Sequence, residues 1–149
     1  MTYEQVLLKL TALCARGEHC LHEMRTKMQR WEVDEDTQQR VLDYLVKERF
    51  VDEERYARFF INDKIKYNRW GRRKVEQALY MKRIPSEVYR PLLDEVEEES
   101  YEEVLVPLLR AKVKSIKAAS DYELRMKLIR YGMQRGFSYE QIEKCLAGL

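Results

Sequence analysis

A helical pattern that recurs three times along the chain constrains the fold more than any other feature. Apolar residues lie three or four positions apart from the N-terminus onward, as at Val6 and Leu10, which is the spacing of an amphipathic helix. Three apolar residues, each expected to follow the second helix of a group of three, are spaced by roughly 50 residues: Val33, Ile84 and Phe137. The positions nine residues before them are apolar as well: Met24, Val75 and Leu128.

This period predicts an all-α fold of three tandem three-helix repeats, at residues 1–49, 50–97 and 98–149. Repeats of this kind pack end to end, so we expect an elongated, curved body. The boundaries of about nine helices follow from start signals and breaks. Asp34 and Asp52 each precede acids that suit a first helical turn, and Ser138 with Gln141 resembles a capping box. Only 5 Gly and 3 Pro occur, which argues against hairpin arrays and flexible linkers.

Spacing also predicts which side chains form the core and close the repeats. Each of three apolar residues is expected to close its own unit: Phe50, Val33 and Phe137. Two aromatic residues lie between positions 64 and 74. Tyr67 is predicted to belong to the core and Trp70 to be exposed, because Trp70 adjoins a turn glycine. The core residues predicted for the middle repeat are Tyr56, Phe59, Phe60, Val75, Leu79, Ile84, Val88 and Leu92.

Composition excludes several classes of protein. The chain has 149 residues, of which 45% are hydrophobic and 36% charged, so a folded and highly charged protein is expected rather than a disordered one. No run of about 20 apolar residues occurs, so no membrane association is expected. The N-terminus has no signal region, which leads us to expect a cytoplasmic protein. We also expect a monomer. Three cysteines, Cys14, Cys20 and Cys145, are an odd number and disfavour a disulfide framework.

The distribution of charge is more informative than its sum, which is +2. Seven acids and no base lie between Asp94 and Glu103, where they suit a helix start. They could also bind a basic surface of a partner or fold back against the basic run of this chain. Six basic residues and no acid lie between positions 64 and 74: Lys64, Lys66, Arg69, Arg72, Arg73 and Lys74. Such cations can bind phosphate or an acidic protein surface, and the intervening Trp70 could stack on an unpaired base.

Other basic residues could extend this surface along the repeats. Lys82 and Arg83 follow on the same predicted helix as Arg73 and are added to the binding site. A weaker set lies on the corresponding helices of the outer repeats: Arg25, Lys27, Arg30, Lys127, Arg130 and Arg135.

At this point the middle repeat resembles a known family. Residues 50–60 read FVDEERYARFF, residues 70–75 read WGRRKV and residues 82–84 read KRI. Residues 135–139, RGFSY, and residues 23–28, EMRTKM, extend the similarity into the other two repeats. The pattern resembles the RecX family, the regulators of the RecA recombinase. The resemblance implies three tandem three-helix repeats and binding to RecA filaments on single-stranded DNA, which limits strand exchange, filament extension and ATPase in DNA repair and recombination. It implies no catalysis and no cofactor.

The chain departs from the family pattern at several positions. Arg69, Glu32 and Arg83 stand where the family often has glycine, and Arg72 stands where it often has proline. Extra charge at 69 and 72 would strengthen anion binding. Gly132 replaces a usual leucine, and we expect it to loosen the third repeat, because glycine inside a helix costs about 1 kcal/mol relative to alanine.

Other functions remain open from the residues alone. No phosphate-binding glycine loop or hydrolase motif is present, so an enzyme is not expected. His19 and His22 lie close to Cys14 and Cys20, but the spacing is poor for one metal ion, so no metal site is expected. A stand-alone helical DNA-binding protein, weak direct DNA binding and a helical scaffold that ignores nucleic acid are the alternatives.

Overall fold

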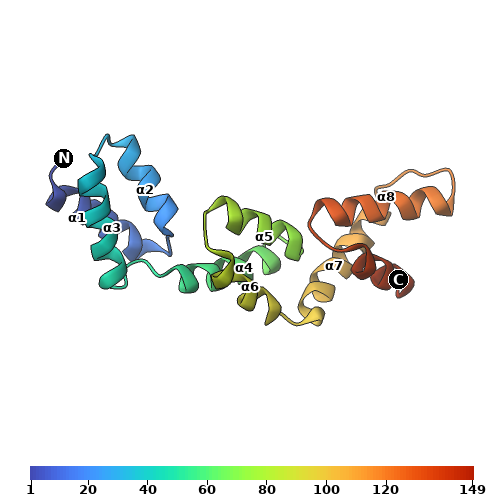
Figure 1. The fold of residues 1–149 in the computed structure, drawn as a ribbon. Helices are drawn as coiled ribbons and strands as arrows, with labels where there is room; N and C mark the ends of the chain where they lie inside the picture. Colours follow the sequence, from blue (N-terminus) through green and yellow to red (C-terminus); the bar gives the residue numbers. More distant parts are fainter. The chain divides into compact units, whose positions relative to one another are not determined.

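The computed structural model describes all residues, 1–149. It contains nine helices and no strand (Figure 1). The all-α fold is therefore confirmed. None of the helices is long and apolar enough to cross a lipid bilayer. The helices are α1 (Tyr3–Arg16), α2 (Leu21–Arg30), α3 (Glu35–Lys47), α4 (Glu53–Lys66), α5 (Arg72–Met81), α6 (Ser86–Asp94), α7 (Glu98–Val113), α8 (Asp121–Gln134) and α9 (Tyr139–Ala147).

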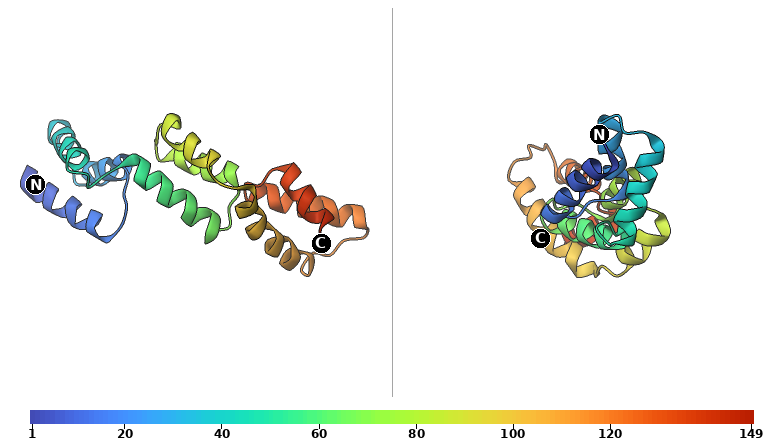
Figure 2. Two further views of the ribbon diagram at one scale, coloured as in Figure 1. Left: turned by 90° about the horizontal axis from the view of Figure 1, so that it is seen from below. Right: turned by 90° about the vertical axis from the view of Figure 1, so that its left-hand side faces the viewer.

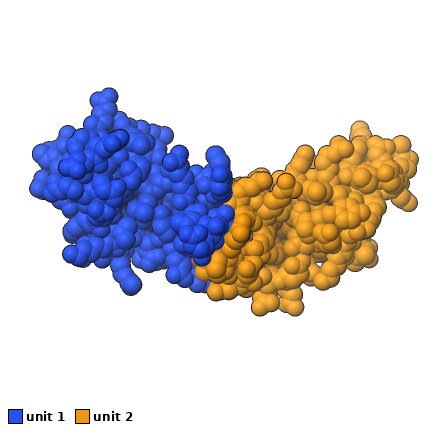
Figure 3. Space-filling model, in the orientation of Figure 1, with its two compact units in different colours: residues 1–59, 79–89 blue, residues 60–78, 90–149 orange.

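The chain forms two compact units, coloured separately in Figure 3. The first unit comprises Met1–Phe59 and Leu79–Tyr89, and the second comprises Phe60–Ala78 and Arg90–Leu149. Helices α4, α5 and α6 therefore each contribute residues to both units. The three repeat boundaries given by the sequence stay a prediction.

In the first unit, α1 and α2 both pack against α3. Their apolar faces form one core, to which Trp31 and Leu13 add partly buried edges. The core residues are Val6, Leu10, Met24, Met28, Val33, Val41, Leu42, Leu45 and Val51. Removal of this apolar surface from water is the main stabilising contribution to the three-helix group.

In the second unit, α7, α8 and α9 pack against one another in all three pairs. The left view of Figure 2 shows these helices, coloured brown to red, grouped at the C-terminal end of the chain. Gly132 lies buried on α8, where a β-carbon would come within 2.7 Å of Cδ1 and 2.8 Å of Cγ1 of Ile142 on α9. The expectation that Gly132 loosens this part of the chain stays a prediction. The missing side chain lets the Ile142 side chain pack directly on the α8 backbone.

The helix ends follow the predicted capping signals. The Asp34 carboxylate accepts a hydrogen bond from the Thr37 amide, and the Asp52 carboxylate accepts one from the Arg55 amide. Ser138 and Gln141 form the predicted capping box, in which each side chain binds the other residue's amide. These bonds satisfy amides that have no partner within the helix.

Four non-glycine residues have left-handed backbone conformations, with φ between 56° and 61°: Glu32, Arg49, Arg69 and Arg83. Glu32 and Arg83 each follow the second helix of their group, at the position that Gly136, with φ 98°, occupies after α8. At all three places the next amide donates to a carbonyl five residues earlier, as from Val33 to Met28. This helix ending favours glycine. Three of the four residues stand where the RecX family pattern often has glycine: Glu32, Arg69 and Arg83. The sequence therefore departs from that pattern at positions where the left-handed backbone favours glycine.

Two turns of the second unit meet backbone to backbone. The Gly71 amide donates to the Arg135 carbonyl at 2.8 Å, and the Arg73 amide donates to the Gly136 carbonyl at 3.1 Å. A β-carbon on Gly71 would overlap the Gly136 carbonyl and lie 2.5 Å from the Phe137 amide nitrogen. One on Gly136 would lie 2.5 Å from Cβ of Lys74. We call this contact the glycine joint; it attaches the start of α5 to the end of α8.

A second joint lies within the first unit and uses side chains. The Cys20 thiol, at the start of α2, lies 3.9 Å from the Lys82 carbonyl, and Lys82 Nζ lies 3.1 Å from Glu23 Oε2. Glu53 Oε1 accepts a hydrogen bond from the Leu21 amide at 3.4 Å, whereas its Oε2 is buried without a partner. Burial, together with the nearby Glu23 and Asp52, raises the pKa of Glu53 to about 7 against the partial compensation of the Leu21 amide. We call this contact the carboxylate joint.

Several predicted core positions are wrong. Tyr67 is 70% exposed because α4 ends before it, whereas Trp70 is half-buried. Phe59 is 57% exposed because the buried face of α4 runs through Ala57 and Ile61. Phe60 and Val88 are only half-buried.

Phe50 is likewise exposed, since Val51 takes the buried position beside it. The Phe50 ring instead stacks on Tyr44 with ring centroids 6.2 Å apart. The other predicted closing residues, Val33 and Phe137, are buried. The remaining middle-repeat predictions are also confirmed as buried: Tyr56, Val75, Leu79, Ile84 and Leu92.

Replacing Glu32 by glycine is expected to stabilise the protein. A left-handed conformation costs an ordinary residue about 1–2 kcal/mol, and the greater freedom of glycine in the unfolded chain offsets about 0.5–1 kcal/mol of that gain. Urea unfolding of Glu32→Gly should therefore show a free energy of unfolding higher by about 0.5–1 kcal/mol. The control Lys27→Gly, inside α2, should lower it by about 1 kcal/mol. A loss of stability in Glu32→Gly would contradict the role assigned to its backbone.

Replacing Gly71 by alanine is expected to break the glycine joint, because the new β-carbon meets backbone that cannot rotate away. We expect a loss of about 1–3 kcal/mol in the free energy of unfolding, with faster hydrogen exchange at the Arg73 amide. Gly17→Ala is the matched control, since no atom lies within 4 Å of a β-carbon there. Equal stability of the two variants would show that the joint tolerates a side chain.

The free energy of unfolding is expected to depend on pH through Glu53. Its pKa of about 7 in the folded protein lies above its ordinary value of 4.5, so the folded state holds this proton more tightly than the unfolded state. The stabilisation it provides is complete below pH 4.5 and is lost as pH rises through 7. Glu53→Gln should remove that part of the pH dependence and stabilise the protein at pH 8, as measured by urea unfolding across pH. Glu54→Gln, exposed and adjacent, is the control and should leave the slope unchanged.

Candidate functional site

The basic segment Lys64–Lys74 covers the end of α4, the following turn and the start of α5, within the second unit. The Trp70 ring contacts two ammonium groups, with Lys64 Nζ at 5.4 Å and Lys74 Nζ at 4.8 Å from its centroid. These cation–π contacts fix the two lysines and hold Trp70 half-buried. The indole therefore supports the cations, and the stronger stacking surface for a base is the exposed Tyr67, beside Lys66 at 5.4 Å.

Two of the predicted binding cations are engaged inside the protein. Arg72 forms an ion pair of 2.7 Å with Asp94, which is where the acidic segment meets the basic one. Arg135 donates from Nη2 to the Asn68 carbonyl at 2.7 Å and from Nε to the Arg69 carbonyl at 3.3 Å. These bonds brace the turn of the glycine joint. Neither guanidinium is free to capture a partner without breaking an internal contact.

Three of the predicted arginines in this unit have no acidic partner. Arg69, Arg73 and Arg130 are exposed and form no ion pair. Lys127, in contrast, pairs with Glu123 at 3.0 Å and donates to the Lys117 carbonyl. Unpaired arginines keep their donors for a carboxylate or phosphate. The structure thus selects Arg73 and Arg130, from two different helices, as unpaired charges that line one groove.

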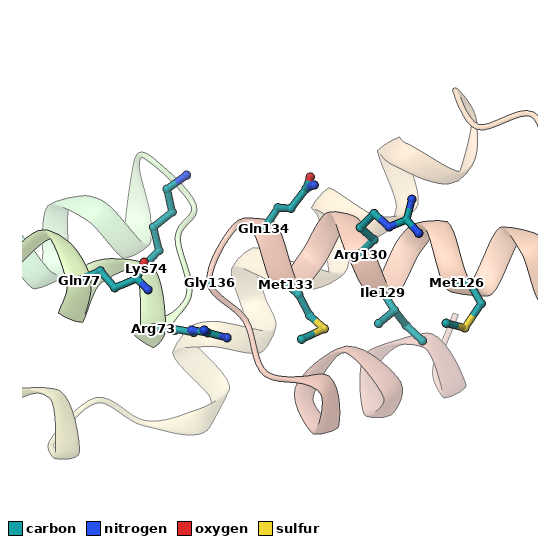
Figure 4. A pocket seen from close by; sticks show the side chains of 9 residues that line it. All are labelled: Arg73, Lys74, Gln77, Met126, Ile129, Arg130, Met133, Gln134 and Gly136. Atoms are coloured by element: carbon teal, nitrogen blue, oxygen red, sulfur yellow. The ribbon is translucent and has the colours of Figure 1, made fainter.

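A groove of about 570 Å³ lies between the start of α5 and α8. Figure 4 shows Arg73 pointing from α5 toward Met133, with Met126, Ile129 and Met133 on one side of α8 and Arg130 and Gln134 on the other. Its lining residues are Arg73, Lys74, Gln77, Met126, Ile129, Arg130, Met133, Gln134 and Gly136. No acidic side chain lines it. The groove therefore combines an apolar floor with a positively charged rim.

The sequence analysis did not identify the methionines of this groove as site residues. Met126 and Met133 are seven residues apart, so they lie on one helical face. The same face carries Ile129, which is buried, so it lies at the edge of the core. Two methionines with this spacing were the available signal.

The remaining predicted cations belong to the first unit. Lys82 forms an ion pair with Glu23, so its charge is neutralised within the carboxylate joint. Arg25 donates to the Gln39 side chain at 3.3 Å. Lys27, Arg30 and Arg83 form no ion pair.

The cysteines lie in environments that suppress their reactivity. Burial raises the pKa of Cys20 to about 12, and burial also raises the pKa of Cys14 and Cys145. The thiols are therefore protonated at neutral pH, and a protonated thiol is a poor nucleophile and a poor metal ligand. His19 lies 3.5 Å from Glu23, in the carboxylate joint.

Comparison with known proteins places these features in a family. Residues 52–90 match the second three-helix domain of RecX, and residues 99–146 match the third. "Regulatory protein RecX" of Clostridium botulinum (strain Eklund 17B / Type B) is 28% identical over 123 residues, covering 81% of this chain and 57% of that protein. The protein of the same name from Finegoldia magna is 32% identical over 101 residues, covering 66% and 49%. The chain thus spans about half the length of these curated relatives.

Solved structures share the fold. The crystal structure of RecX from Lactobacillus salivarius superposes with a TM-score of 0.87 at 16% identity, covering 99% of this chain and 96% of that one. A second crystal structure of a regulatory protein RecX gives a TM-score of 0.89 at 15% identity, covering 97% and 73%. The two domain matches together cover more than half of the sequence. The chain belongs to the RecX family of regulatory proteins.

Proposed function

We propose that this chain regulates the RecA recombinase by binding RecA filaments on single-stranded DNA. The expected outcome is inhibition: less strand exchange, less filament extension and less ATP hydrolysis. The proposal rests on family membership and on one structural observation, the free arginines beside the Lys64–Trp70–Lys74 cluster. RecA is inferred as the partner because the relatives are regulatory proteins RecX, and the process served is recombinational DNA repair.

The surface suits a filament because a filament presents both DNA phosphates and protein carboxylates. Arg69 and Arg73 have free donors, and Lys66 and Tyr67 offer a charge beside an exposed ring. Arginine binds either anion through two parallel hydrogen bonds. Attraction between opposite charges therefore contributes to binding, and the affinity should fall as the salt concentration rises.

Inhibition of this kind needs no chemistry on the part of the regulator. A helical body seated in the filament groove would block entry of a duplex, and one bound at a filament end would block addition of further subunits. Regulation requires only that the chain bind the filament more tightly than free RecA or free DNA. Cofactors and metal ions have no role in the proposed action, and the chain acts as a monomer in the cytoplasm.

The first test is RecA-catalysed ATP hydrolysis on single-stranded DNA, titrated with this chain. We expect the rate to fall at well below one chain per RecA subunit. Arg73→Glu with Lys74→Glu should require about tenfold more protein, a loss of about 1.4 kcal/mol in binding. The matched control is Arg110→Glu with Lys114→Glu, which makes the same charge change at exposed positions near the end of α7.

Equal inhibition by both double variants would remove the site. No inhibition by the folded wild-type chain at any ratio would overturn the proposed function. Tight binding to duplex DNA without RecA would then favour an independent DNA-binding protein, and binding that ignores nucleic acid and salt would favour a scaffold.

A further inference from the structure

The groove between α5 and α8 has a chemistry that differs from that of a nucleic-acid surface. Its floor is made by Met126, Ile129 and Met133, which occupy one face of α8. Bases bind to proteins by stacking on aromatic rings, and no aromatic side chain lines this groove. Met126 and Met133 are each 42% exposed, so their flexible thioethers are available to a partner. Methionine side chains adapt to apolar partner residues and are frequent at peptide-binding surfaces.

The rim carries charge of one sign. Arg73 and Arg130 have no acidic partner, and Lys74 rests only on the Trp70 ring. Because no acid lines the groove, nothing within it neutralises these three cations. A partner that fills the groove must therefore supply negative charge at the rim and apolar groups at the floor.

The length of the floor limits the size of the occupant. The α8 residues that line the groove run from Met126 to Gln134, which is roughly 12 Å at 1.5 Å per residue. Two turns of helix match this length. An amphipathic helix presents apolar residues at intervals of three and four along one face, which is the periodicity of the floor.

We propose that this groove is a docking site for a short, acidic, amphipathic helix of a protein partner. The apolar face of that helix lies on Met126, Ile129 and Met133, and its carboxylates pair with Arg73, Lys74 and Arg130. The inference rests on the proposed function for the identity of the partner, the RecA filament. It deepens that function by assigning these cations to protein carboxylates rather than to DNA phosphates.

The test uses fluorescence anisotropy of the full chain with a labelled synthetic peptide of about 14 residues. The peptide carries leucines on one helical face and glutamates on the other. A second peptide has the same composition with the leucines dispersed, a third has glutamine in place of glutamate, and a labelled oligothymidylate represents single-stranded DNA. We expect the first peptide to bind at least about tenfold more tightly than the second and third.

Two double variants examine the two parts of the groove separately. Met126→Ser with Met133→Ser removes the exposed floor, and Arg73→Gln with Arg130→Gln removes two rim charges. Each should weaken binding of the first peptide by about tenfold or more. Met81→Ser and Arg110→Gln are the controls, as an exposed methionine and an exposed arginine that do not line the groove. Circular dichroism of each variant checks that helicity is retained.

Three outcomes would overturn the inference. The first is peptide binding that the methionine variant leaves unchanged, which indicates charge attraction alone. The second is loss of oligothymidylate binding, with peptide binding retained, in the arginine variant, which assigns the cations to nucleic acid. The third is absence of peptide binding to the wild-type chain.

The RecA assay separates failure of this inference from failure of the proposed function. Inhibition of RecA ATPase by a chain that binds no peptide removes the groove and leaves the function. Peptide binding by a chain that does not affect RecA removes the function and leaves the groove.

Discussion

The second unit depends on a contact in which two glycine-containing turns touch with no side chain between them. The Gly71 and Arg73 amides donate to the carbonyls of Arg135 and Gly136, and the Arg135 side chain returns two hydrogen bonds to the turn after α4. Since backbone groups are nearly rigid, the joint fixes the start of α5 against the end of α8 more tightly than packed side chains could. The groove with its floor on α8 and its rim partly on α5 exists because this distance is fixed.

The same contact decides which cations are available to a partner. Arg135 is used to brace the joint, and Arg72, one residue past Gly71, is directed to Asp94. The next residue, Arg73, forms no ion pair and lines a groove that contains no acid. A basic run that looks uniform in the sequence thus separates into structural and available charges within two positions, because successive residues of a helix point in different directions.

The fold could be predicted from the sequence because helical periodicity and capping are local. Val33, Ile84 and Phe137 mark the ends of equivalent helices, and Asp34 and Ser138 cap the next ones. The exposure of Tyr67 and Phe59 could not be predicted, since it depends on where α4 ends and how it is rotated toward its neighbours. Contact between the acidic segment and the basic run was one alternative that the sequence offered, but the pair Arg72–Asp94 could not be named, because the two residues are far apart in the chain. The close packing at Gly132 could not be predicted for the same reason: the helix propensity of glycine is local, but Ile142 lies on another helix.

The two joints use equivalent positions of the repeated pattern but different chemistry. In each, the residue that precedes a group's second helix, Cys20 or Gly71, meets the turn that ends the second helix of the next group. The glycine joint consists of neutral backbone hydrogen bonds, which do not titrate. The carboxylate joint contains the Glu23–Lys82 ion pair and Glu53, whose pKa is raised to about 7 by burial and by neighbouring acids. Near neutral pH the first unit therefore contains a joint whose strength varies with protonation, whereas the joint that shapes the groove does not.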